Sequence, residues 1–95
     1  MQGKLIDLEF LHPKDSTETF QMGVAPQATA RQTVQQLLVG DADGPWLDPE
    51  PAGRPYELVL SRTEKLIPSG QTIGDSGAAD GDYIAVMQPG QGAGL

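Results

Sequence analysis

The chain has 95 residues, 13 of them acidic and 6 basic, which gives a formal net charge of −7 near neutral pH. This length predicts one domain with a single compact core and leaves no room for an enzyme with a deep cleft. The negative charge argues against nucleic-acid binding, because phosphates are held mainly by Lys and Arg. It favours protein partners that carry basic or mixed charge.

Cysteine is absent from the sequence. Disulfides, thiolate nucleophiles and Cys-ligated zinc are therefore excluded. No run of 18 apolar residues occurs, and polar residues interrupt the first segment before a signal-peptide core could form. We expect a cytoplasmic protein that does not contact a membrane.

Two strands are expected in the first quarter of the chain. Ile6, Leu8 and Phe10 alternate with acidic residues, which is the pattern of a strand with one buried face. A second alternation covers 19–24, and the intervening turn residues at 12–16 predict that the two strands form a hairpin.

A helix of about three turns is expected next. Thr29 and Gln32 have the spacing of a capping box, in which each side chain bonds the backbone of the other residue. Gly40 is placed to end the helix in a left-handed conformation. The apolar stripe between these ends contains Val34, Leu37 and Leu38.

The second half of the chain begins with a long loop at 41–55, which contains four prolines. Alternation of Tyr56, Leu58 and Leu60 predicts a third strand, and residues 65–67 a short fourth strand. The core is expected to contain Ile6, Leu8, Val34, Leu37, Leu58 and Ile84.

The last strand is expected at 83–87, after a turn at 80–82 in which Gly81 allows a tight reversal. Its apolar run is typical of a central strand covered on both faces or nearly so. Residues 72–77 predict a single tight helical turn before it. In that turn we expect Ile73 to plug the end of the sheet and Asp75 to cap backbone amides.

This order of elements predicts an α+β fold of the β-grasp type, with a mixed sheet of four to five strands and one helix packed across it. The expected boundaries are a β-grasp domain at 1–87 and a flexible glycine-rich C-terminal tail at 88–95. Internal repeats and a second domain are not expected.

The segment 66–84 resembles the ubiquitin-like proteins. In that family an apolar residue and a Gly-containing turn precede a Thr-Leu/Ile-x-Asp element, here Thr72 to Asp75, and an Asp-Gly-Asp type of turn precedes the last strand. The resemblance covers essentially the whole chain. It implies the β-grasp fold, but ubiquitin-like binding domains share the pattern without being modifiers.

The tail favours the modifier branch of that family, whose members end in a flexible segment that carries glycine. There the terminal carboxylate is adenylated by an activating enzyme and then passed to a cysteine as a thioester. Gly90, Gly92 and Ala93 would lie in the narrow channel of such an enzyme, since small residues leave room for close walls. Eight extended residues reach at most about 29 Å, which is enough for this task.

The terminus departs from the family's Gly-Gly pair, because the corresponding positions are Gly92 and Ala93. The expected resolution is that a peptidase removes Leu95 and exposes the carboxylate of Gly94. The resemblance is greater to bacterial ubiquitin-like proteins, which implies four partners: a ubiquitin-activating-like enzyme, a conjugating enzyme, a JAB-type metallopeptidase and target proteins. Lys4, Lys14 and Lys65 are candidate acceptors of a second modifier.

Partner-binding residues elsewhere are less clearly marked. The positions that align with part of ubiquitin's apolar patch are Ser61, Ala85 and Met87, of which only Met87 is plainly apolar. Ubiquitin-specific partners are therefore not expected. Trp46 is a candidate partner anchor, and the alternative is that it folds back over an edge of the sheet.

No metal site, cofactor or catalytic group is expected. The acidic residues of the long loop could resemble a calcium site, but Gly44-Pro45 breaks the spacing of an EF-hand. His12 has no nearby Cys, Ser or His with which to form a triad or a metal site and is expected in a turn.

The sequence thus predicts a ubiquitin-like modifier of bacterial type that supplies an acyl group and is not an enzyme. One alternative is a noncovalent ubiquitin-like adaptor of a secretion or phage-related assembly. Another is a sulfur carrier, in which the terminal carboxylate becomes a thiocarboxylate.

Overall fold

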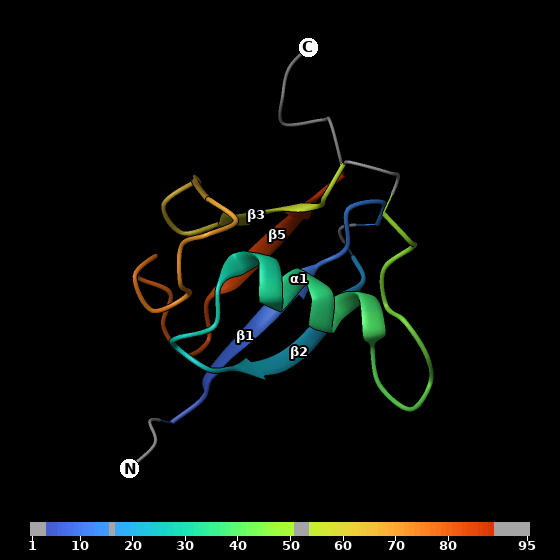
Figure 1. Ribbon diagram of the computed structural model, residues 1–95, viewed down its shortest axis with the longest axis horizontal. Helices are drawn as coiled ribbons and strands as arrows, with labels where there is room; N and C mark the ends of the chain where they lie inside the picture. Colours follow the sequence, from blue (N-terminus) through green and yellow to red (C-terminus); the bar gives the residue numbers. More distant parts are fainter. Residues whose placement is uncertain (1–3, 16, 51–53, 89–95) are drawn as a thin grey trace.

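The computed structural model describes residues 4–15, 17–50 and 54–88, which hold five strands and one helix (Figure 1). In chain order they are β1 (Ile6–Leu11), β2 (Thr19–Val24), α1 (Ala30–Val39), β3 (Glu57–Leu60), β4 (Lys65–Ile67) and β5 (Tyr83–Met87). The predicted elements are therefore present with nearly the predicted bounds. Residues 89–95, which carry most of the predicted tail, lie outside the described part.

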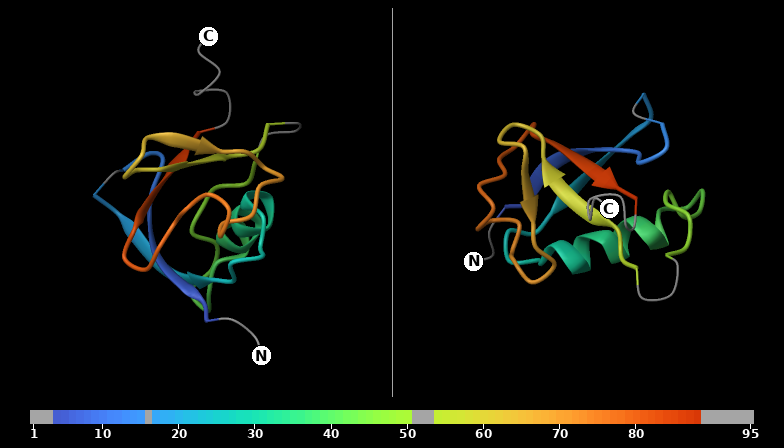
Figure 2. Two further views of the ribbon diagram at one scale, coloured as in Figure 1. Left: turned by 90° about the vertical axis from the view of Figure 1, so that its left-hand side faces the viewer. Right: turned by 90° about the horizontal axis from the view of Figure 1, so that it is seen from above.

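The five strands form one mixed sheet in the order β2-β1-β5-β3-β4. β1 and β2 pair antiparallel as the predicted hairpin, and β5 inserts between β1 and β3, parallel to the first and antiparallel to the second. The sheet curves around α1, which covers one of its faces (Figure 2). This is the predicted α+β β-grasp architecture, with five strands.

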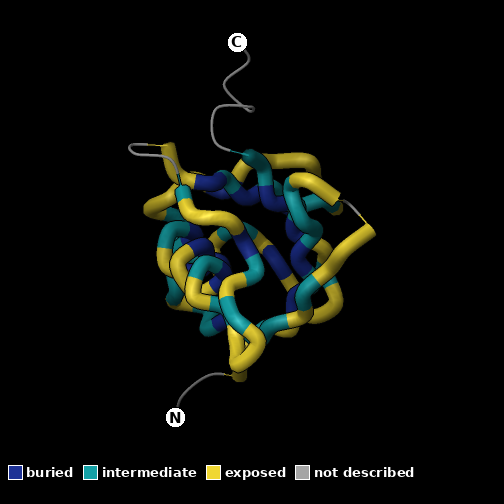
Figure 3. Tube along the Cα trace, turned by 90° about the vertical axis from the view of Figure 1, so that its right-hand side faces the viewer, coloured by how far each residue is buried: buried dark blue, intermediate teal, exposed yellow. Residues whose placement is uncertain are grey.

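The core lies between α1 and the concave face of the sheet (Figure 3). Apolar residues at every second strand position face the helix stripe, which explains the alternation seen in the sequence. The largest fully enclosed apolar side chains are Leu8, Phe10, Val24, Val34, Leu37, Leu58, Leu60, Ile73 and Ile84. All but one of the predicted core residues are buried. Ile6 is the exception and packs only partly buried against the rim of the core.

The ends of α1 are set by local side-chain chemistry. The Thr29 hydroxyl accepts a hydrogen bond from the Gln32 amide at 3.1 Å, and the Gln32 side chain accepts one from the Thr29 amide at 2.9 Å, which confirms the capping box. Gly40 ends the helix at φ 75° and ψ −148°. Its φ is positive as predicted, but its ψ lies outside the left-handed helical region, because the chain turns at once into the Asp41 to Gly44 bridge.

The segment before β5 differs in one detail from its prediction. Residues 72–77 make the predicted single turn, in which the Ser76 amide donates to the Thr72 carbonyl at 3.2 Å with the spacing of a helical bond. The Asp75 amide donates to the Thr72 hydroxyl at 3.1 Å, so Thr72 supplies the cap that was expected from Asp75. Ile73 is fully buried and Gly81 has φ +87°, both as predicted.

β5 occupies the centre of the sheet as predicted, but only one of its faces is covered. Ile84 and Val86 are buried beneath α1, whereas Tyr83 on the other face is 48% exposed. The expectation of near-complete cover was wrong, since within the described residues the only helix lies on the concave face. No helix in this part of the chain has the length and apolar character needed to span a membrane.

Candidate functional site

The convex face of the sheet, opposite α1, carries a row of apolar side chains that we call the apolar row. Strand register aligns Leu11 with Ala85, Ala85 with Val59 and Val59 with Leu66, so the row crosses four strands. Leu66 is 50% exposed and the other three are partly exposed. A row of partly exposed apolar side chains on an uncovered face is a candidate surface for contact with another protein.

Two of the predicted partner-binding residues lie at this row. Ala85 is part of it, and Met87 lies on the same face two residues further along β5, opposite Glu57. Ser61 follows the end of β3, where its amide donates to the Tyr83 carbonyl at 3.0 Å. The residue paired with Ala85 on β3 is Val59, not Ser61. The convex face is consequently more apolar than Ser61, Ala85 and Met87 alone would indicate.

The sequence contains a signal for Val59 on the convex face. Because side chains alternate along a strand, a residue between buried Leu58 and Leu60 must point to the opposite face. Leu66 is paired with Val59, and this pairing places it on the same face. What the sequence does not provide is the register, which decides that these side chains meet in one row.

Carboxylates flank the apolar row. Glu9 is paired with Tyr83 and with Gln21, and Glu57 is paired with Met87. The face therefore combines apolar side chains with negative charge at its margins. This arrangement suits contact with a protein surface that has apolar and basic groups.

Trp46, the third predicted partner-binding residue, packs against the β1–β2 hairpin. Its ring stacks on Phe20 at a centroid distance of 5.5 Å and meets the edge of His12 at 4.9 Å. The indole N–H donates to Glu18 at 3.1 Å, and the His12 ring is hydrogen-bonded to the Trp46 carbonyl at 3.2 Å. Trp46 thus folds back over edge strand β2, and its partner-binding role stays a prediction.

Two acidic residues of the long loop, Asp48 and Glu50, form ion pairs with other parts of the fold. Glu50 accepts hydrogen bonds from Arg31 at 2.7 Å and from the Tyr56 amide at 3.0 Å, and the Arg31 bond lowers the pKa of the Glu50 carboxyl below its usual value. Asp48 pairs with Lys14 at 2.7 Å, which lowers the Asp48 pKa. These contacts fasten the loop to α1 and to the hairpin.

No group of three His, Cys, Asp or Glu side chains able to hold a metal ion occurs in the described ranges. Asp41 accepts a hydrogen bond from the Asp43 amide at 2.9 Å, which stabilises the turn after α1. The carboxylates of Asp41, Asp48 and Glu50 therefore each accept from a different partner.

The start of β5 is fixed by an ion pair. Arg62 donates to both Asp82 oxygens at 3.1 and 3.0 Å and to the Gly77 carbonyl at 2.8 Å. Asp82 also accepts from the Ala79 amide at 2.9 Å. The Arg62 bond, with a smaller contribution from Ala79, lowers the pKa of Asp82. The turn that precedes the last strand is thereby locked to the β3–β4 connection.

The predicted reactive end lies beyond the described residues. The residues outside the description include Gly90, Gly92, Ala93, Gly94 and Leu95. β5 ends at Met87, so only Gln88 and Pro89 separate the central strand from Gly90 in the sequence.

In comparisons with known proteins, no protein-family model and no curated protein matches the chain.

Proposed function

We propose that this chain is a ubiquitin-like protein modifier of bacterial type. Its reactive group is the Gly94 carboxylate, which a peptidase exposes by hydrolysing the bond between Gly94 and Leu95. The chain supplies the acyl group and catalyses nothing itself. The partners are an activating enzyme, a conjugating enzyme, a JAB-type metallopeptidase and target proteins.

The acyl group of Gly94 is transferred in three steps. A Gly94 carboxylate oxygen attacks the α-phosphorus of ATP, forming an acyl adenylate and releasing pyrophosphate. An enzyme thiolate then attacks the acyl carbon and releases AMP, which gives a thioester. Finally an amine of the target attacks the thioester, and the amide forms as the thiolate leaves and takes up the proton that the amine loses.

The observation that carries the proposal is the position of β5. This strand lies between β1 and β3, and the sequence passes from it within two residues into a segment rich in glycine. A tail that begins at a central strand has a fixed origin on a rigid domain, while its small residues can enter a channel that excludes the domain. The flanking strands hold that origin, since Met87 at the end of β5 is paired with Glu57 of β3.

The test is intact-protein mass spectrometry of the chain produced together with the products of its neighbouring genes. Under the proposal the Leu95 residue mass is lost, and ATP-dependent adducts joined through Gly94 appear. Gly94→Val is expected to abolish the adducts, because a β-branched side chain is bulky at the reacting carbon. The matched control is Gly70→Val, where an added Cβ meets nothing within 4 Å and adducts should persist.

A full-length protein that forms no adduct with any neighbouring enzyme would overturn the proposal. If that protein instead bound a larger assembly noncovalently, the adaptor alternative would replace it. A product mass that shows sulfur in place of a terminal oxygen would favour the sulfur carrier.

A further inference from the structure

A hollow of about 250 Å³ lies between the start of β2 and the turn that follows α1. Its lining combines two aromatic residues, Phe20 and Trp46, with three acidic residues, Glu18, Asp41 and Asp43. No Lys or Arg lines it within the described part of the chain. We call it the Trp46 hollow. Its volume is below the roughly 300–1,000 Å³ of sites that enclose a whole small molecule, so it suits a single side chain.

The aromatic part of the hollow is held in place by the rest of the fold. The rings of Phe20 and Trp46 stack at a centroid distance of 5.5 Å. The Trp46 amide donates to the Leu37 carbonyl at 3.3 Å, and the indole N–H donates to Glu18 at 3.1 Å. Because both the backbone and the ring of Trp46 are already fixed, a ligand that binds here has little order to create.

The three carboxylates differ in what they already bond. Glu18 accepts from the Trp46 indole, and Asp41 accepts from the Asp43 amide at 2.9 Å. The Asp43 side chain is exposed and has no hydrogen bond or ion pair with any other described residue. The ion pairs found in the described ranges all use carboxylates outside the hollow. The hollow therefore carries negative charge that none of these ion pairs neutralises.

A flat cation is complementary to both parts of this lining. Positive charge is attracted to carboxylates and also to the faces of aromatic rings, among which Trp is the strongest partner. Arg combines these contacts better than Lys does. Its planar guanidinium stacks on aromatic rings, is more weakly hydrated than an ammonium, and can donate two parallel hydrogen bonds to one carboxylate. An anionic ligand would instead be repelled by the three acidic residues.

We propose that the Trp46 hollow binds an arginine side chain of a partner protein. The guanidinium lies against the aromatic rings and donates hydrogen bonds to Asp43 and Asp41. Trp46 thereby takes part in partner binding as a wall of the site, while it stays folded against β2. All of these residues precede the C-terminal tail in the chain, so the inference does not depend on the proposed modifier function.

The test is NMR titration of the full-length chain, at low salt, with the capped tripeptides Gly-Arg-Gly, Gly-Lys-Gly and Gly-citrulline-Gly. Citrulline has the shape of Arg and lacks its charge. The Arg peptide should shift the indole N–H signal of Trp46 and the amide signals of Asp43 and Gly44, with a dissociation constant on the order of 1 mM. The Lys peptide should bind about threefold more weakly or worse. The citrulline peptide should cause no shift, and the signals of the apolar row should not move with any peptide.

Two pairs of variants separate the charge of the hollow from its aromatic wall. Asp43→Asn removes one carboxylate with almost no change of shape and should weaken binding of the Arg peptide about two- to fivefold. Asp75→Asn is the matched control, because it makes the same change near the other end of α1, where Thr72 is bridged to Thr29. Trp46→Leu should weaken binding about threefold or more, whereas Trp46→Phe keeps a ring and should lose less. In both Trp46 variants the backbone amides of the hollow report the binding.

Several outcomes would overturn the inference. One is an Arg peptide that shifts none of these signals, and another is a citrulline peptide that binds as well as the Arg peptide. Equal losses in Asp75→Asn and Asp43→Asn would show that the peptide responds to the net charge of the chain and not to the hollow. Arg54 is exposed and lies outside the ion pairs found among the described residues. If sedimentation shows self-association that Arg54→Ala abolishes, the arginine in the hollow comes from a second copy of the chain and not from a partner protein.

Discussion

Gly40 is required by the backbone that ends α1. Its φ is +75°, and a Cβ built there would lie 1.9 Å from the Gly44 carbonyl oxygen. Gly40→Ala should therefore lower the free energy of unfolding by about 1–3 kcal/mol or more, measured by urea denaturation. Gly70→Ala is the matched control, because a Cβ at Gly70 meets nothing and should leave stability unchanged or slightly higher. Equal effects of the two substitutions would show that the turn after α1 relaxes freely.

Leu37 tests whether the apolar stripe of α1 packs against the sheet. It is fully buried, whereas Leu66 on the apolar row is 50% exposed. Leu37→Ala should lower the free energy of unfolding by roughly 2–5 kcal/mol, because it leaves a cavity in the core. Leu66→Ala should cost under about 0.5 kcal/mol, since it is a surface change. A small loss at Leu37 would contradict the packing of α1 on the sheet.

Single residues show what local sequence can and cannot predict. The capping box of Thr29 and Gln32 depends only on residues three positions apart, and it was predicted correctly. The cap before β5 was assigned to Asp75, although Thr72 supplies it, because both residue types cap turns and sequence does not show which side chain faces the open amide. Val59 was not predicted as the neighbour of Ala85, because this pairing depends on strand register, which the sequence does not show.

The loop after α1 is held by Glu50, and this contact makes the free energy of unfolding depend on pH. The folded pKa of Glu50 lies below its ordinary value of 4.5, mainly because Arg31 donates to it. A lowered pKa means that the stabilisation is complete above about pH 4.5 and is lost as pH falls through the folded pKa. We expect Glu50→Gln to lower stability by about 1 kcal/mol at neutral pH and to flatten the loss of stability below pH 4.5.

Thermal unfolding measured from neutral pH into the acid range checks this expectation. The matched control is Glu57→Gln, which also removes one carboxylate but none of the ion pairs found among the described residues. An acid-side slope that is the same in Glu50→Gln as in the original chain would show that Arg31 contributes little to holding the loop.

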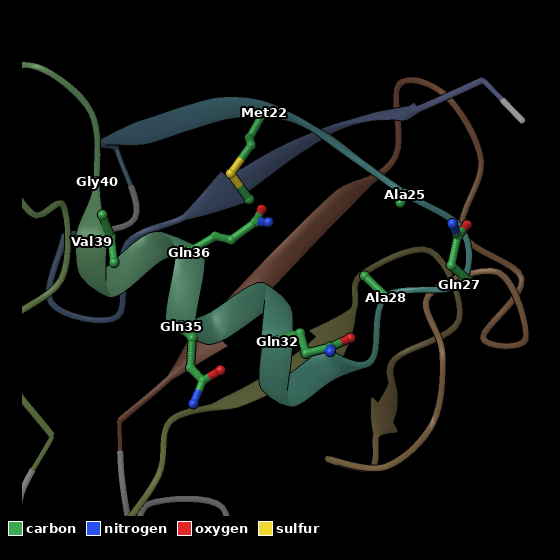
Figure 4. A pocket seen from close by; sticks show the side chains of 9 residues that line it. All are labelled: Met22, Ala25, Gln27, Ala28, Gln32, Gln35, Gln36, Val39 and Gly40. Atoms are coloured by element: carbon green, nitrogen blue, oxygen red, sulfur yellow. The ribbon is translucent and has the colours of Figure 1, made fainter. Parts of the chain in front are cut away.

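The strands and the helix could be predicted from the periodicity of apolar residues. Which of their faces stay uncovered could not. The apolar run at 83–87 predicts a central strand, and β5 is central. The same run predicted cover on both faces, because an apolar pattern does not show whether a second layer exists. The hollow between β2 and α1 (Figure 4) was likewise not predicted, since its lining comes from a strand and a helix whose spacing is set by tertiary packing.

The described core and elements all precede the proposed reactive end in the chain. The core is built from residues between Leu8 and Val86, and the six elements end at Met87. A chain that stops after Gln88 should therefore unfold at nearly the same temperature as the full chain. It should form no ATP-dependent adducts, because Gly94 is gone. Calorimetry and mass spectrometry on this one truncated protein measure the two properties. A clear drop in unfolding temperature would mean that residues 89–95 contribute to the fold. Adducts that persist in the truncated protein would show that Gly94 is not the reactive residue.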